Sequence, residues 1–164
     1  MSQLEFEESA LEANAISKNF KHKGSPRVLV VCGSAIRAAE LTRRLRPISK
    51  RQVAKLFSKH IKIEEQKKLL EGNAVDIGVG TPNRILKLIE SGHLRITQLR
   101  LILVDCTKDQ KMRMVIDMDE TREDLYTLWK NHLAKLVCES APSPESEQDG
   151  AKRGVRLRLF ETSY

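Results

Sequence analysis

Residues 75–85 read Val-Asp-Ile-Gly-Val-Gly-Thr-Pro-Asn-Arg-Ile. The apolar, β-branched side chains over residues 75–79 predict a buried strand. Thr81 then offers the side-chain oxygen that N-cap residues use, and Pro82 suits the first position of a helix. The stretch therefore predicts a strand that runs directly into a helix, and the Ser-Gly pair at residues 91–92 predicts where that helix ends.

The same alternation of strands and helices continues on both sides of this stretch. Further strands are predicted over residues 27–32, 99–105 and 155–160, and further helices over residues 3–20, 35–45, 63–70 and 121–137. Residues 49–57 fit either a short strand or a helical turn. In the last helix, Thr121 and Asp124 resemble a capping box. Alternating strands and helices predict an α/β fold with a parallel sheet and helices on both faces.

Composition divides the chain into four segments. We expect an N-terminal helix and basic loop over residues 1–26 and the α/β domain over residues 27–138. Residues 139–150 are rich in Ser, Pro, Glu, Gln and Gly, which favours a flexible linker. Residues 151–164 form a basic tail or a final strand, and such a tail could also dock onto RNA or a protein.

The overall charge favours a polyanion as partner. The chain of 164 residues has a net charge of +7, with 31% charged and 40% hydrophobic residues. Nucleic acid is the first candidate for such a chain, although a lysine-rich surface is also common in soluble proteins. Aromatic residues make up 4% of the chain, so base stacking is disfavoured and contacts with phosphate and sugar are expected.

Several classes of protein are disfavoured by the sequence. Cys32, Cys106 and Cys138 are far apart and form no C-x-x-C pair, which argues against a zinc site and a disulfide framework. No run approaches the roughly 18 apolar residues that a membrane span needs. The first residues are acidic rather than basic and then apolar, unlike a signal peptide. We expect a soluble intracellular protein with no metal, no cofactor and no membrane partner.

Three predicted strand ends carry the residues of interest, because ligands of parallel α/β sheets bind at the carboxyl ends of strands. These ends are Gly33–Ser34, Gly80–Thr81–Pro82 and Asp105–Cys106–Thr107. Their order and spacing resemble the first RecA-like domain of DEAD-box RNA helicases. Thr81-Pro82-Asn83-Arg84 is similar to the motif Ib sequence Thr-Pro-Gly-Arg.

The other two strand ends resemble helicase motifs less closely. Residues 28–34 resemble motif Ia, with Ser34 in place of a threonine and Ala35 where the helicases have arginine. Residues 101–105 resemble the strand of the Asp-Glu-Ala-Asp box, of which Asp105 remains as a vestige of motif II. Residues 159–163 loosely resemble the strand that leads to the Ser-Ala-Thr motif.

Two departures from the helicases bear on activity. The sequence has no G-x-x-x-x-G-K-[ST] phosphate loop, and the acidic pair of a working box is broken after Asp105. We therefore expect neither ATP hydrolysis nor, with no second RecA-like domain in the sequence, strand separation. A degenerate domain with a Val-Asp-Cys-Thr box and Thr-Pro-Asn-Arg resembles the Cms family of the small-subunit processome. That resemblance implies a nuclear and nucleolar protein, a monomer, with pre-ribosomal RNA and assembly proteins as partners.

The resemblance suggests an RNA-binding site at the strand ends. The Thr81 hydroxyl and the amides after Pro82 could bind one phosphate at a helix N-terminus, and Arg84 a neighbouring one. Taken alone, Thr81 would be a plain N-cap and Arg84 a solvated side chain, but the surrounding strand order favours contact with RNA. Ser34 and Arg37 could line the same groove, and Ser34 fits a helix cap equally well. Asp105 is expected to be structural.

A basic stretch follows the first strand end and could follow an RNA backbone electrostatically, or be an ordinary solvated surface. Its residues are Lys50, Arg51, Lys55, Lys59, Lys62, Lys67 and Lys68.

Three functions therefore compete. The first is a non-catalytic RNA- or ribonucleoprotein-binding protein, and the second is a protein-interaction scaffold that does not bind RNA. The third, a nucleotide-using enzyme, would need a phosphate loop or a G-x-S-x-G elbow, and the sequence has neither.

Overall fold

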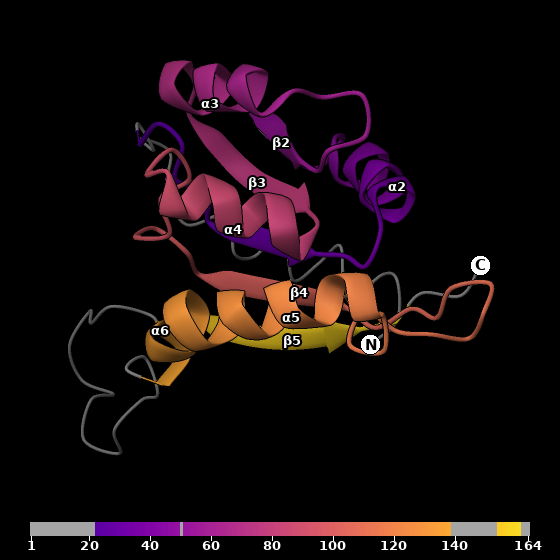
Figure 1. Ribbon diagram of the computed structural model, residues 1–164. Coiled ribbons are helices and arrows are strands. Elements are labelled where there is room, and N and C mark those ends of the chain that lie inside the picture. Colours follow the sequence, from indigo (N-terminus) through magenta and orange to yellow (C-terminus); the bar gives the residue numbers. More distant parts are fainter. Residues whose placement is uncertain (1–21, 50, 139–153, 162–164) are drawn as a thin grey trace.

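The computed structural model describes residues 22–49, 51–138 and 154–161. Within them, five parallel strands form one sheet in the order β2-β3-β1-β4-β5 (Figure 1). The strands are β1 (Val28–Val31), β2 (Gln52–Leu56), β3 (Val75–Gly80), β4 (Leu101–Asp105) and β5 (Arg156–Phe160). The predicted α/β fold is thus confirmed, and residues 49–57, which fitted two alternatives, contain an edge strand.

Helices cover both faces of the sheet. They are α2 (Ala35–Leu45), α3 (Ile63–Gly72), α4 (Pro82–Glu90), α5 (Asp119–Leu128), the π-helical turn η1 (Trp129–Leu133) and α6 (Ala134–Cys138). One apolar core joins α2 to one face, and a second joins α3, α4 and α5 to the other. Figure 1 shows α4 and α5 side by side in front of the strands. No described helix is long and apolar enough to cross a membrane.

The predicted capping box is wrong. Helix α5 begins at Asp119, two residues before Thr121, and its N-cap is Met118. The Thr121 hydroxyl donates to the carbonyls of Val115 (2.9 Å) and Met118 (3.3 Å). Asp124 instead accepts a hydrogen bond from the Asn83 side chain at 2.9 Å. The pattern failed because Thr121 bonds to carbonyls of the preceding segment and Asp124 to a side chain of α4, rather than to backbone N–H groups at the helix start.

The π-helical turn in the last helix could not be read from the apolar pattern. Leu128 and Leu133 are both buried although they are five positions apart. In a regular α-helix such a spacing turns one of the two side chains away from the core, whereas a π-helical turn keeps both on one face. The local change of helix type therefore holds α5 and α6 against the same sheet.

Strand β5 confirms the expected final strand, since it pairs in parallel with β4 from Leu101↔Arg156 to Asp105↔Phe160. The predicted helix over residues 3–20 and the predicted linker over residues 139–150 lie outside the described residues.

The strand order decides which loops meet. Strands β3, β1 and β4 are neighbours, so the residues that follow them lie along one edge of the sheet. The close packing of β2 against β3 also restricts which amino acid can precede Thr81. A Cβ atom on Gly80 would lie 1.9 Å from the Leu56 carbonyl oxygen, so glycine alone fits there.

Candidate functional site

Arg37 forms a network of ionic hydrogen bonds at the carboxyl ends of β1 and β4. Its Nε donates to Asp105 Oδ2 at 2.6 Å, its Nη1 to Glu40 at 2.9 Å and its Nη2 to the Thr107 hydroxyl at 3.2 Å. Asp105 Oδ1 accepts the Thr107 backbone N–H at 3.0 Å. Arg37 and Asp105 are only 8% and 3% exposed.

The network keeps Arg37 charged although it is buried. Burial lowers the pKa of the Arg37 guanidinium, but its bonds to Asp105 and Glu40 outweigh that effect and raise the pKa above its ordinary value. A buried charge needs such partners. Asp105, which was expected to be structural, accepts a hydrogen bond from Arg37. The Arg37 side chain, which was predicted to contact RNA, is thus bonded within the protein.

Ser34 at the same end caps a helix. Its hydroxyl oxygen accepts the backbone N–H of Arg37 at 3.2 Å, at the N-terminus of α2. The adjoining turn is covered by the loop after β4, since a Cβ on Gly33 would lie 3.0 Å from the Met118 sulfur. Both Ser34 and Arg37 thus have partners in the protein, and their contact with RNA stays a prediction.

The end of β3 is different. Thr81 is the N-cap of α4 with extended backbone angles, but its side chain makes no capping hydrogen bond. Its N–H donates to the Leu56 carbonyl at 3.0 Å, and its carbonyl accepts from Ile85 at 3.1 Å. Pro82 at the first helical position is buried and has no N–H. Thr81 is half-buried, and its hydroxyl has no hydrogen-bond partner among the described residues.

Arg84 links three elements instead of lying free in solvent. Its Nη1 donates to Gln66 Oε1 at 2.8 Å and to the Ile61 carbonyl at 3.2 Å. Burial lowers the pKa of its guanidinium. Within the described residues, both bonds use Nη1, so Nη2 and Nε remain available on this half-buried side chain. The simple picture of a solvated arginine is thus wrong, while contact with RNA stays a prediction.

Gln66 has a hydrogen-bonding role that the sequence analysis did not assign to it. Its Nε2 donates to the carbonyls of Lys55 (2.7 Å) and Phe57 (2.9 Å), while its oxygen accepts from Arg84. Gln66 and Leu70 are the buried residues of α3. A polar side chain one helical turn before a buried leucine was a signal for this role, because a buried amide needs hydrogen-bond partners.

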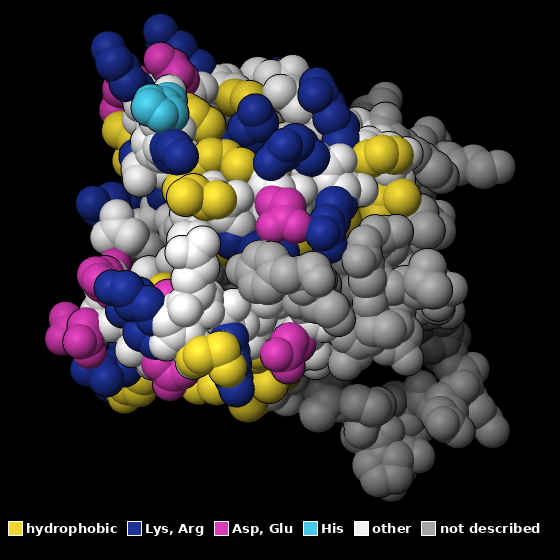
Figure 2. Space-filling model, turned by 90° about the vertical axis from the view of Figure 1, so that its right-hand side faces the viewer, with side chains coloured by type: hydrophobic (Ala, Val, Ile, Leu, Met, Phe, Trp, Pro, Cys, Tyr) yellow, Lys and Arg dark blue, Asp and Glu magenta, His cyan; other side chains and the backbone are white. Residues whose placement is uncertain are grey.

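Part of the predicted basic stretch is exposed. Lys55, Lys59, Lys62 and Lys68 are exposed, and Lys50 lies outside the described residues. Lys67 pairs with Glu64 at 2.8 Å. Figure 2 shows Lys and Arg side chains interspersed with apolar ones over the upper part of one face. Among the described residues, no group of His, Cys, Asp or Glu is arranged to hold a metal ion.

Comparison with known proteins identifies relatives of the chain. The sequence profile of a family described as CMS1, U3-containing 90S pre-ribosomal complex subunit, matches residues 4–138. Protein CMSS1 of Homo sapiens is 39% identical over 127 residues, covering 76% of this chain and 45% of that protein. Protein CMS1 of Chaetomium thermophilum is 43% identical over 125 residues, covering 74% and 50%. The chain spans about half the length of the curated relatives it matches.

A solved structure shows the likeness of fold. The chain superposes on Dbp5 of S. cerevisiae with a TM-score of 0.52 and 12% sequence identity, over 87% of this chain and 31% of the other. At that identity the likeness concerns the fold alone, which is that of a RecA-like domain of a DEAD-box helicase. The expected fold resemblance is thereby confirmed.

Proposed function

The chain belongs to the CMS1 family of U3-containing 90S pre-ribosomal complex subunits, and on this premise we propose that it is a non-catalytic RNA-binding protein of small ribosomal subunit assembly. The same proposal locates it in the nucleus and nucleolus, as a monomer bound to pre-ribosomal RNA and assembly proteins. Its RNA-binding surface lies at the N-terminus of α4, where Thr81 and Arg84 are found.

The observation that carries the proposal is the Thr81 hydroxyl without a partner among the described residues. Thr81 begins α4 but does not cap it, and the first backbone N–H bonded within the helix is that of Ile85. The N–H groups of Asn83 and Arg84 therefore point out of the helix end. A hydroxyl and two amides at a helix N-terminus form a good environment for one phosphate.

The surrounding charges favour contact with the RNA backbone. Arg84 has two guanidinium nitrogens without partners among the described residues, and a guanidinium binds a phosphate through paired hydrogen bonds. Lys55 on β2 and Lys59 and Lys62 on the loop that follows β2 are exposed. With few aromatic side chains in the chain, we expect binding that depends on backbone charge and little on base sequence.

The test is RNA binding by purified protein across a salt series. Thr81→Val keeps the shape of the side chain and removes only the hydroxyl, which makes no bond within the described protein. Since a hydrogen bond to a charged group contributes about 1.5–3 kcal/mol, we expect at least tenfold weaker binding of single-stranded RNA. Asn83→Ala serves as the matched control, because its exposed side chain bonds to Asp124.

Two outcomes would argue against this surface. Equal affinity of the folded Thr81→Val variant would move RNA contact to the exposed lysines. No binding at low salt would contradict RNA binding by this chain. Arg84→Ala is a weaker test, because it also removes the partner of Gln66 and must be judged beside its effect on thermal stability.

A protein-interaction scaffold without RNA binding is the second candidate. It is favoured by the use of Arg37 and Arg84 in hydrogen bonds within the protein. For either function we expect Mg-ATP to leave the melting temperature unchanged, whereas a nucleotide-dependent rise would support the enzyme hypothesis.

A further inference from the structure

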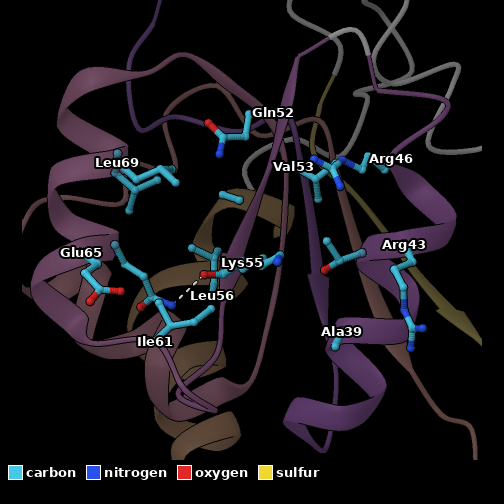
Figure 3. Close-up of a pocket in the computed structure, with 14 residues that line it drawn as sticks. Ala39, Arg43, Arg46, Gln52, Val53, Lys55, Leu56, Ile61, Glu65 and Leu69 are labelled. Atoms are coloured by element: carbon cyan, nitrogen blue, oxygen red, sulfur yellow. Dashed lines mark hydrogen bonds between the residues drawn. The ribbon is translucent and has the colours of Figure 1, made fainter.

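A groove lies at the β2 edge of the described sheet, and two of its lining residues, Leu56 and Gln66, hydrogen-bond to Thr81 and Arg84. It encloses about 590 Å³ and is bounded by α2 on one side, α3 on the other and the edge strand β2 between them. Figure 3 shows Ala39, Arg43 and Arg46 on the α2 side and Glu65 and Leu69 on the α3 side. The groove therefore runs beside a strand whose outer side has no neighbouring strand in the described sheet.

The outer side of β2 presents unused backbone groups to this groove. The Lys55 carbonyl is capped by Gln66, whereas the Leu56 carbonyl on the opposite side accepts from Thr81. Because the backbone groups of a strand alternate between its two sides, the N–H of Lys55 and both groups of Val53 point outward. None of these three groups has a hydrogen-bond partner among the described residues.

Gln66 limits how much of the edge is open. Its amide occupies the carbonyls of Lys55 and Phe57, and the Ser49 hydroxyl donates to the Arg51 carbonyl at 2.8 Å. The open stretch is thus short and lies between two capped ends. An exposed edge of this kind accepts an added strand, and the caps restrict pairing to one short segment.

The walls of the groove are complementary to a segment of a particular composition. Arg43, Arg46 and Lys55 are exposed on the α2 side and along the strand, and Glu65 is exposed on the α3 side. Ile61 and Leu69 are half-buried apolar residues of the lining. An extended peptide with acidic residues toward α2 and an apolar residue toward α3 would satisfy both walls.

We propose that the edge of β2 between α2 and α3 is a docking site for an extended, acidic segment of a partner protein, which pairs with Val53 and Lys55 as an added strand. The unpaired backbone groups favour a peptide over RNA, since they recognise another main chain and an apolar wall contributes nothing to phosphate binding. This inference does not require RNA binding at Thr81, although the Lys55 side chain is one of the charges that we propose to favour RNA.

The probe is a phage-displayed library of short random peptides panned against the purified protein. We expect enriched sequences that combine acidic residues with an apolar anchor. A synthetic, fluorescein-labelled peptide of the enriched sequence is then titrated by fluorescence anisotropy. Lys55→Pro removes the outward N–H, which proline on an edge strand can lack without breaking the ladder, and should weaken binding at least tenfold. Lys55→Ala, which keeps the N–H, should weaken it less.

Two further measurements keep the proposal open to failure even if Lys55→Pro disturbs the fold. Arg43→Gln with Arg46→Gln should weaken peptide binding at least tenfold, with only a small loss of melting temperature from the weaker charge at the C-terminus of α2. In the unaltered protein, hydrogen exchange at the amides of Val53 and Lys55 should slow at least tenfold when the peptide is bound.

Four results would overturn the proposal. They are a library without enriched acidic peptides, binding unaffected by Lys55→Pro in a folded protein, and unchanged exchange at the β2 amides. The fourth is a paired substitution of Arg43 and Arg46 that abolishes the binding of single-stranded RNA but not the binding of any peptide. A dimer in sedimentation velocity that dissociates with the same substitutions would assign the edge to a second copy and overturn it equally.

Discussion

Two regions at the carboxyl edge of the sheet, one where β1 and β4 end and one where β3 ends, use the same kinds of residue in opposite ways. At the β1 and β4 end, Ser34 caps α2, and Arg37 and Asp105 neutralise each other in the interior. At the β3 end, Thr81 begins α4 without capping it, and Arg84 keeps guanidinium nitrogens without described partners. One end is closed by its own hydrogen bonds, while the other retains groups that can bind a ligand.

This contrast shows that the presence of a motif in the sequence does not determine what its side chains do in the structure. A hydroxyl at a helix start and an arginine one turn later occur at both ends, yet local partners decide whether they stabilise the protein or remain available. Stability measurements should therefore separate the two ends as sharply as binding measurements do.

The largest expected effect is at the closed end. Arg37→Met leaves the buried Asp105 carboxylate without its cation, which should lower the free energy of unfolding by about 3–5 kcal/mol in urea denaturation. Combining it with Asp105→Asn removes the uncompensated charge and should recover part of that loss. If the double variant is no more stable than Arg37→Met, the pair is not the reason for the loss.

Substitution of Gln66 should have the next largest effect on stability, because its side chain bonds both to Arg84 at the β3 end and to the edge strand β2. Gln66→Leu keeps the side chain buried but leaves the carbonyls of Lys55 and Phe57 and the Arg84 guanidinium without their partner. We expect a loss of about 1–3 kcal/mol in thermal or urea unfolding. Lys68→Ala on the exposed side of the same helix is the control, and an equal loss there would remove the special role of Gln66.

Matched hydroxyl substitutions compare the two ends directly. Ser34→Ala removes a working N-cap and should cost about 1 kcal/mol of stability. Thr81→Val removes a hydroxyl that caps nothing, so its effect on unfolding should stay within about 0.5 kcal/mol. If urea denaturation shows a larger loss of unfolding free energy for Thr81→Val than for Ser34→Ala, then Thr81 and not Ser34 stabilises its helix, which would contradict the comparison.

The smallest expected difference between the two regions is in the reactivity of their cysteine thiols. Burial, with the nearby Asp105 carboxylate, raises the pKa of the Cys32 thiol well above its ordinary value, and the pKa of the Cys106 thiol is raised for the same reasons. Both stay protonated at neutral pH, whereas Cys138 is exposed. Iodoacetamide followed by mass spectrometry should label Cys138 first and Cys32 last. Early labelling of Cys32 in the native protein would mean that the closed end opens.

The order of strands and helices could be predicted because it depends on local patterns. The strand over residues 75–79 and the Thr-Pro helix start were visible in neighbouring residues, and the structure places them in β3 and α4. The boundaries of α5 and the π-helical turn were missed, because loop partners and a buried pair five positions apart overrode the local signal.

The state of the candidate site could not be predicted because it depends on distant contacts. Arg37 and Asp105 are 68 positions apart, and only the neighbouring positions of β1 and β4 bring them together. Likewise, Arg84 and Gln66 meet across two elements separated by a strand. The groove beside β2 exists only because the strand order leaves β2 at the edge, which no motif in the sequence specifies.

The amide of Gln66 gives the fold a hydrogen-bonded chain with a fixed direction. The Arg84 guanidinium donates to the Gln66 oxygen, and the Gln66 nitrogen donates to the carbonyls of Lys55 in β2 and of Phe57 just after it. Turning the amide over would set nitrogen against guanidinium and oxygen against carbonyl, so one orientation alone is compatible with its neighbours. A cation at the start of such a chain polarises every bond behind it. The hydrogen-bond chain through Gln66 thus couples the edge strand β2 to Arg84 in the first turn of α4.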